Sequence, residues 1–285
     1  MLELRQRRLG WKEPDTGRGR SNRGIPMAEP LRNYQTRTVP YGRSDAAIDE
    51  GLRAYMIRVY NLMGMGLLIT GLAAVAAIMM ATTNDPSAAV ATLPSGQMLT
   101  SFGYAIFASP LKWLVILAPL GAVFFLSFRV QSMSVPAAQT TFWIYAGLVG
   151  LSLSSIFLIY TTASVTQTFF ATAAAFGALS LYGYTTKRDL TAMGSFLIMG
   201  VFGLIIAMVI NIFLQSSALS FAVSAIGVLI FAGLTAYDTQ KIKEMYFEGD
   251  DQVVAGRKSI MGALTLYLDF INLFMFLLQF MGDRR

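Results

Sequence analysis

Residues 195–237 read SFLIMGVFGLIIAMVINIFLQSSALSFAVSAIGVLIFAGLTAY and contain no charged side chain. A transmembrane helix needs about 20 apolar residues to cross about 30 Å of hydrocarbon. This stretch is long enough for two such helices, and the polar residues QSS at 215–217 divide it. A link this short predicts that the two helices, 195–214 and 219–237, form an antiparallel pair.

Five further apolar windows occur along the chain, at residues 59–81, 111–130, 142–160, 166–184 and 260–281. The 285 residues are 55% hydrophobic and only 13% charged, whereas soluble domains carry about 25% charged residues. A charge at the centre of a membrane costs at least about 2.5 kcal/mol, so such avoidance is typical of chains that lie in lipid. We predict an all-α integral membrane protein whose residues 51–285 form a seven-transmembrane-helix bundle.

Residues 1–50 differ from the rest, since they hold ten of the 22 Lys and Arg residues together with several Pro, Gly and Ser residues. This composition cannot bury a core, which predicts a disordered, polar and basic N-terminal tail. The net charge of +6 is largely a property of this tail, because the chain without residues 1–26 would carry +2. We therefore expect no nucleic-acid partner.

The basic residues also orient the bundle. Every second connection between windows is basic, and the alternate connections hold only Lys112. Because Lys and Arg concentrate on the cytoplasmic side of membrane proteins, we predict a cytoplasmic N-terminus. Arg284 and Arg285 are an exception to this rule, because a count of seven spans places them outside the cytoplasm. A re-entrant seventh helix would also explain their position. The basic residues of the connections are Arg129, Lys187, Arg188, Lys241, Lys243, Arg257 and Lys258.

The chain contains no His and no Cys. Their absence excludes Ser-His and Cys-His nucleophiles, disulfides and zinc sites with His or Cys ligands. An intramembrane aspartyl protease would need only two aspartates, but the GxGD signature of presenilin-type enzymes is replaced by LYLD at 266–269. We predict that the protein is not an enzyme and has no resident cofactor.

Two carboxylates are the candidate functional groups, Asp238 at the end of the sixth window and Asp269 inside the seventh. Asp269 lies nine residues beyond Ile260, about 13 Å into the membrane. Thr265 and Asn272 share its helix face and are candidate supporting residues. The alternatives are structural: Asp269 would form a helix-to-helix hydrogen bond, and Asp238 would be an ordinary interfacial charge.

If the sixth and seventh helices are neighbours, Asp238 and Asp269 can meet. Two carboxylates at close range do not both ionise easily, so such a pair would titrate as a unit and respond to pH. Carboxylate oxygens are also the ligands that Ca²⁺ prefers, which makes both residues candidate, transient Ca²⁺ ligands. Arg129 would either extend to the lipid headgroups or turn inward to pair with an aspartate.

Three motifs carry a resemblance: AYDTQKI at 236–242, LYLDFINLF at 266–274 and LYGYTTKRDL at 181–190. Over residues 48–280 the chain resembles the Bax inhibitor-1 family, its bacterial branch in particular. The resemblance implies a seven-helix bundle with a central seventh helix, and a pH-sensitive calcium leak with paired aspartates. On the motifs, Asp238 and Asp269 match that pair, and Arg129 is similar in position to the arginine that latches to it.

The resulting prediction is a calcium-leak channel gated by Asp238 and Asp269, with the lipid bilayer, Ca²⁺ and protons as its partners. Its predicted location is a bacterial inner membrane. The family also contains proteins that restrain the membrane protease FtsH. The alternative prediction is therefore a regulatory membrane protein that binds such a protease and transports nothing.

Overall fold

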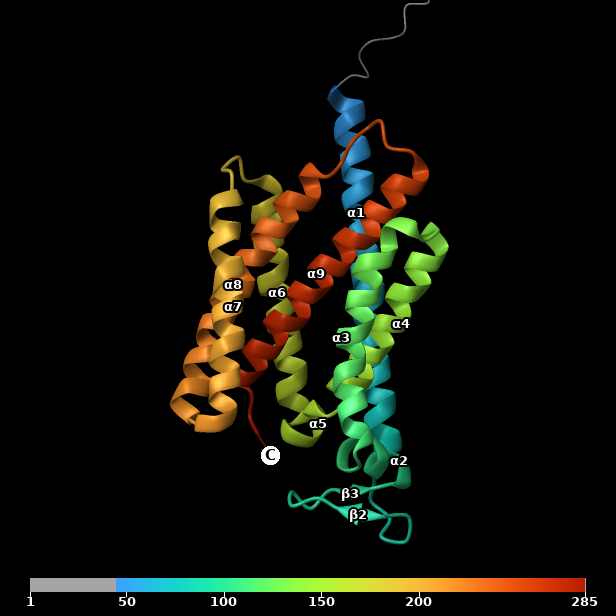
Figure 1. The fold of residues 1–285 in the computed structure, drawn as a ribbon, viewed down its shortest axis with the longest axis vertical. Helices are drawn as coiled ribbons and strands as arrows, with labels where there is room; N and C mark the ends of the chain where they lie inside the picture. The colour runs from blue at the N-terminus through green and yellow to red at the C-terminus, as the bar shows by residue number, and fades with distance from the viewer. Residues whose placement is uncertain (1–44, 285) are drawn as a thin grey trace, which may run out of the picture. The chain divides into compact units, whose positions relative to one another are not determined.

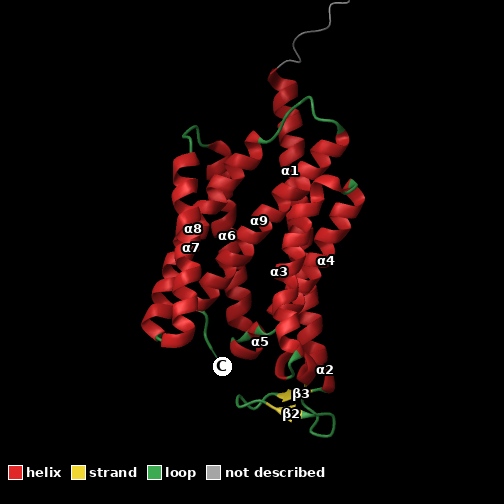
Figure 2. Cartoon of the chain, in the orientation of Figure 1, coloured by secondary structure: helices red, strands yellow, loops and turns green. Residues whose placement is uncertain are grey.

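The structure is a computed structural model that describes residues 45–284, and residues 1–44 and 285 lie outside the described part. Nearly all of the described chain is helical (Figures 1 and 2). The elements, in chain order, are α1 (Asp45–Ala81), β1 (Thr82–Thr83), β2 (Ala91–Thr92), β3 (Met98–Leu99), α2 (Ser101–Gly103), η1 (Tyr104–Ala108), α3 (Leu111–Arg129), η2 (Val130–Ser132), α4 (Val135–Leu153), α5 (Ile156–Ile159), α6 (Thr162–Thr185), α7 (Thr191–Leu214), α8 (Ser217–Glu244) and α9 (Gln252–Met281).

Seven of the helical segments in the described residues are long and apolar enough to cross a membrane, as predicted. Several begin before the predicted windows, because polar turns continue the helices beyond the apolar core. Helix α9, for example, begins at Gln252 rather than at residue 260, after the Asp251 side chain accepts a hydrogen bond from the Val254 amide. The third span consists of α4 and α5, which are separated at Ser154 and Ser155.

The predicted tail at 1–50 falls mostly outside the described residues. Its last six residues, 45–50, belong to α1, and the prediction of disorder for residues 1–44 is not addressed by the structure. The bundle has two ends. The basic end holds the links at 130–134, 186–190 and 245–251 together with the Lys and Arg residues in and beside them, and the sheet end holds β1, β2 and β3.

Helix α9 occupies the centre of the bundle. It packs against α1, α4, α6 and α8, and about 61% of its apolar span is buried, compared with 11% for the spans of α3 and α7. Figure 1 shows α9 running obliquely, with α8 and α6 on one side and α1 and α4 on the other. The central position of the seventh span is thereby confirmed.

The residues that follow α9, 282–284, lie towards the sheet end, so α9 crosses the whole bundle. Beyond α9, the carbonyl oxygen of Asp283 accepts a hydrogen bond from the Thr161 amide, and the Asp283 amide donates to the Ser164 hydroxyl. The Arg284 guanidinium lies 5.9 Å from the centre of the Tyr160 ring. These contacts attach the end of α9 to the start of α6, and the seventh span is not re-entrant.

A small antiparallel sheet, which the sequence pattern did not predict, connects α1 to α2. Its strand order is β1-β3-β2, and Leu99 pairs with both Thr82 and Ala91. Each strand has only two residues, too few to give a period-two pattern. The sheet follows the end of α1 in the chain, and Figure 2 shows its strands next to α2.

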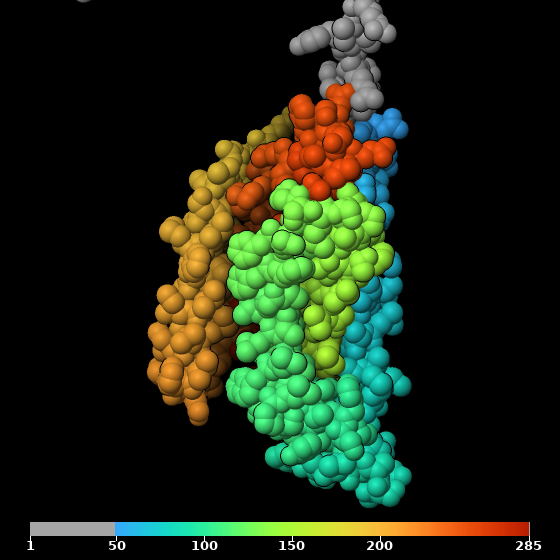
Figure 3. Space-filling view, turned by 45° about the vertical axis from the view of Figure 1, so that its right-hand side comes forward, coloured from blue at the N-terminus to red at the C-terminus, as the bar shows by residue number. Residues whose placement is uncertain are grey.

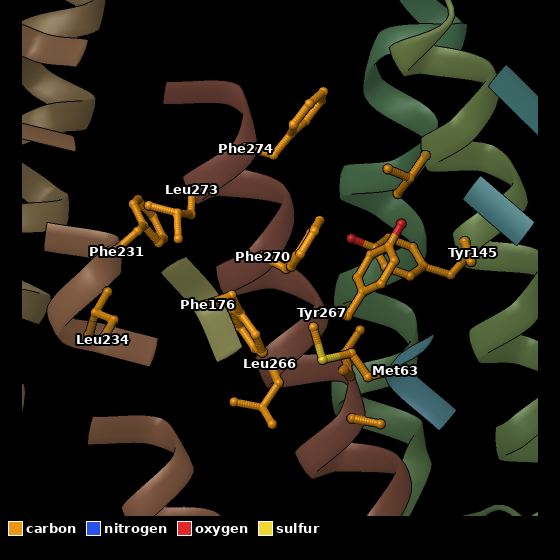
Figure 4. Packing of buried hydrophobic residues seen from close by; sticks show 14 of the residues in the cluster. Met63, Tyr145, Phe176, Phe231, Leu234, Leu266, Tyr267, Phe270, Leu273 and Phe274 are labelled. Carbon is orange, nitrogen blue, oxygen red and sulfur yellow. The ribbon is translucent and has the colours of Figure 1, made fainter. Parts of the chain in front are cut away.

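Glycines allow two close helix approaches that hold the bundle together. A methyl group on Gly183 of α6 would collide with the Ala236 carbonyl oxygen of α8, and one on Gly150 of α4 would collide with the Thr70 carbonyl oxygen of α1. Small residues at such crossings let backbones approach closely in lipid. The core between these helices is rich in aromatic rings around Tyr267 and Phe270 of α9 (Figure 4).

Candidate functional site

The two candidate aspartates meet where α8 packs against α9. The Asp238 and Asp269 carboxyl groups lie close enough to interact directly. Asp269 is only 5% exposed, and its Oδ2 atom has no hydrogen-bond partner in the described residues. An ionised carboxylate can only accept hydrogen bonds, so a bond between two carboxyl groups requires one of them to carry a proton. A hydrogen bond between these two carboxyl groups would therefore contain a shared proton.

The surroundings of the two carboxyl groups differ. Asp269 lies near the middle of α9, whereas Asp238 is half-buried and lies within two turns of the end of α8. Lys241, one turn beyond Asp238, is close enough to interact with it electrostatically. One member of the pair thus faces the bundle interior, and the other is accessible from the basic end.

The two predicted supporting residues flank Asp269 but do not bind it. The Thr265 hydroxyl donates to the Met261 carbonyl oxygen at 3.1 Å, and the Asn272 amide donates to the Leu268 carbonyl oxygen at 2.8 Å. Both bonds stay within α9. Neither residue supplies the missing partner of Asp269 Oδ2.

Arg129 lies in the last turn of α3, and its side chain is exposed. Among the described residues it forms no ion pair with either aspartate. Of the two orientations considered from the sequence, the structure has the outward one. Helix α3 packs chiefly against α4 and η1, and Figure 3 shows atoms of α9 (dark red) between α3 (green) and the orange α7 and α8.

Gln240, which the sequence reasoning did not single out, fixes the end of α8 that carries Asp238. Its Oε1 atom accepts a hydrogen bond from the Leu190 amide at 2.9 Å, and its Nε2 atom donates to the Arg188 carbonyl oxygen at 2.8 Å. Lys243 donates to the Tyr184 carbonyl oxygen at 2.8 Å. The link between α6 and α7 is therefore attached to α8. The signal available in the sequence was the position of Gln240 inside AYDTQKI.

A chain of hydroxyl groups runs from α1 to the residue that follows Asp238. The Tyr60 hydroxyl lies 2.6 Å from the Ser180 hydroxyl, which lies 2.9 Å from the Thr239 hydroxyl. Thr239 in turn donates to the Thr235 carbonyl oxygen. Helices α1, α6 and α8 are thereby joined beside the aspartates by groups that are buried or half-buried.

The site contains few metal ligands. The described residues contain no group of three or more His, Cys, Asp or Glu side chains that could hold a metal ion. Two carboxyl groups supply fewer oxygens than the six to eight that Ca²⁺ takes, so backbone carbonyls or water would have to complete its shell. This ligand set suits an ion in passage better than one that is held.

Comparisons with known proteins agree with this arrangement of helices. A family model described as "Inhibitor of apoptosis-promoting Bax1" matches residues 52–285, which include both aspartates. An uncharacterized protein of Rickettsia prowazekii is 47% identical over 250 residues, which are 88% of this chain and 98% of that protein. The inner membrane protein YbhL of Escherichia coli K12 is 45% identical over 249 residues, 86% of this chain and 99% of YbhL.

Proposed function

This chain belongs to the Bax inhibitor-1 family of integral membrane proteins, and on that premise we propose that it is a pH-sensitive calcium leak gated by Asp238 and Asp269. The observation that carries the proposal is the close approach of the two carboxyl groups, one of which is almost fully buried in the central helix. An ionisable group inside a membrane span is costly and therefore indicates function.

The shared proton supplies the pH sensitivity. While the pair holds its proton, it carries one negative charge and its two carboxyl groups attract each other. Loss of the proton leaves two negative charges, and unit charges 4 Å apart repel by about 4 kcal/mol at an effective dielectric constant of 20. A shift of about 1.4 kcal/mol already changes a two-state equilibrium tenfold, so this repulsion is large enough to gate a channel.

The same loss of a proton creates a site that attracts cations. Two ionised carboxylates present hard oxygen ligands for Ca²⁺, and the half-buried Asp238 offers the approach from the basic end. Helices α3 and α7 are the least buried of the spans, and the exposed Arg129 of α3 would turn inward as the latch. We assign the basic end to the cytoplasm and the protein to a bacterial inner membrane, the location named for its relative YbhL.

Calcium flux from proteoliposomes tests the proposal. Wild-type protein should give a flux that changes between pH 5 and pH 8, and Asp269→Asn should abolish that change, because an amide cannot exchange the shared proton. Asp85→Asn is the matched control. Asp85 lies outside the spans and accepts hydrogen bonds from the Ser87 hydroxyl and amide, which hold its pKa below the usual range, so it stays ionised throughout these pH values.

If Asp238→Asn and Asp269→Asn both keep the wild-type flux at every pH, the pair is a structural contact and the aspartate gate is refuted. Wild-type protein that gives no calcium flux at any pH would refute the leak itself, and the regulatory alternative would then apply, in which the protein restrains a membrane protease such as FtsH. That function predicts co-purification of the protease with both variants, whereas the leak does not require a protein partner.

A further inference from the structure

Helices α1 and α6 both pack against α9, and the groove between them, here called the seam, is lined by residues of both helices. At the basic end, the seam opens into a recess of about 600 Å³. Towards the sheet end, a second recess of about 570 Å³ follows between the same two helices, with α9 as part of its wall. The two recesses share one face of α1, which carries Arg53, Ile57 and Tyr60 in the first and Gly64, Leu68 and Val75 in the second.

The recesses exist because glycines leave the helix surfaces bare. Gly177 of α6 lines the first recess, and Gly64 and Gly71 of α1 line the second. A methyl group added to any of the three would meet no atom within 4 Å. Most of the other lining side chains are apolar, and both recesses lie at the depth of the spans. In a bilayer, the apolar molecules available at this depth are acyl chains.

The end of the seam that meets the headgroup region is basic. Arg53 is the charged residue in the lining of the first recess, and among the described side chains no carboxylate pairs with it. Tyr184 lines the same recess, and the Lys243 ammonium lies 5.4 Å from the centre of its ring. A phosphate at this position would meet two cations, each of the kind that attracts anionic lipids near a membrane surface.

We propose that the seam between α1 and α6 binds one anionic phospholipid from the leaflet at the basic end. Its phosphate lies at Arg53 and Lys243, and one acyl chain fills the recess at Gly177 and reaches towards Gly64. Arg53 and Gly64 are eleven residues apart, about 16 Å along α1, close to the thickness of one leaflet. The lipid thus fits the recess by length, by polarity and by charge.

The lipid also lies beside the hydroxyl chain that leads to the aspartates. Tyr60 and Ser180 line the first recess, and Ser180 lies within hydrogen-bond distance of Thr239, which follows Asp238. An acyl chain in the recess would exclude water from these hydroxyl groups and fill the space between α1 and α6. The binding site does not depend on calcium transport, and its test uses no ion.

Native mass spectrometry of the detergent-purified full chain tests the proposal, with dioleoyl phosphatidylglycerol and dioleoyl phosphatidylcholine as the two probes. We expect the wild type to retain one phosphatidylglycerol with at least tenfold preference. Arg53→Gln should remove the preference, and Arg53→Lys should restore most of it. Gly177→Trp should fill the recess and lower the affinity at least tenfold, whereas Gly121→Trp is the control, because Gly121 is equally open but lies on α3, outside the seam.

Equal retention of the two lipids by the wild type would overturn the proposal, since it would indicate ordinary annular lipid. So would wild-type affinity in Gly177→Trp. If Gly177→Trp does not fold, Gly64→Trp places the same bulk in the second recess, at another glycine with open space. If these recess variants lose the lipid but keep calcium flux, the lipid site is supported and is independent of the leak. If a variant loses calcium flux but keeps the lipid, the result concerns the leak alone.

Discussion

The hydroxyl groups of Tyr267 on α9 and Thr70 on α1 lie 2.6 Å apart in the core of the bundle. Thr70 Oγ1 is also within 2.9 Å of the Ala146 carbonyl oxygen and 3.0 Å of the Gly66 carbonyl oxygen. Because carbonyl groups only accept, Thr70 gives its single proton to them, and Tyr267 must be the donor to Thr70. One threonine thereby joins α1, α4 and α9.

Replacing Tyr267 with Phe keeps the ring, which packs edge-on against Phe142 and Tyr145, but removes the hydroxyl donor. We expect the free energy of unfolding to fall by about 1 kcal/mol, the usual value of such a bond. Unfolding in mixed detergent micelles would measure it. Tyr182→Phe, at a tyrosine on the exposed face of α6, should leave the stability unchanged, and equal effects in the two variants would contradict the prediction.

Gly183→Ala should push α6 away from α8, because the new methyl group collides with the Ala236 carbonyl oxygen, a backbone atom that cannot rotate aside. Overpacking of this kind costs about 1–3 kcal/mol. Gly177→Ala on the same helix meets no atom and should be neutral or slightly stabilising, since Ala is the better helix former. Thermal unfolding of the two variants in one detergent compares them directly. A Gly183→Ala protein as stable as Gly177→Ala would show that the crossing is looser than described.

Gln240→Leu should release the link between α6 and α7 from α8. The change leaves the Leu190 amide without its acceptor, and an unsatisfied buried amide costs about 1–3 kcal/mol. Hydrogen exchange should therefore accelerate at Leu190, which is measurable by mass spectrometry of peptides that cover 186–194. Gln131→Leu, at an exposed residue of η2, is the matched control. Unchanged exchange at Leu190 would mean that Gln240 does not hold the link.

Asp238→Asn and Asp269→Asn should act as one change rather than as two. If each single variant already removes the shared proton, the second substitution has no shared proton left to remove. The effect of the double variant on the pH dependence of calcium flux should therefore be smaller than the sum of the single effects. Flux at pH 5, 6, 7 and 8 in the four proteins provides the comparison. Additive effects would show that the two carboxyl groups titrate independently.

Cysteines at Ser95 and Ser132 should react from opposite sides of the membrane. Both residues are exposed, Ser95 at the sheet end and Ser132 at the basic end, and the chain has no native Cys. The basic links predict that only Ser132→Cys is protected from an impermeant maleimide added outside intact cells. Labelling of both from outside would refute the topology.

Hydropathy located the spans because a run of about 20 apolar residues without charge is rare outside a membrane. The meeting of Asp238 and Asp269 was also predictable, because consecutive antiparallel spans are usually neighbours and both carboxyl groups lie away from the sheet end. The partner of Tyr267 was not predictable. Thr70 is 197 residues away in sequence, and its identity depends on the crossing of α1 and α9, which no local pattern specifies.

Two other features escaped prediction for similar reasons. The two-residue strands at the sheet end are too short to leave a periodic signal. Gln240 looked like an ordinary polar residue at the end of a span, since its role depends on backbone groups at Arg188 and Leu190 that the fold brings to it. Sequence indicates which groups are costly to bury, whereas the fold decides what satisfies them.

The central position of α9 has a consequence for how the protein is made. This helix follows the six other spans in the order of synthesis, yet it contacts four of them. The earlier spans must therefore enter the membrane before the helix that fills the space between them has been made. Helix α9 must then insert into that space together with its buried Asp269. Until the ribosome has passed residue 281, the nascent protein has no completed core. A variant that slows the insertion of α9 would expose the half-built bundle to quality-control proteases, even where its finished fold is stable.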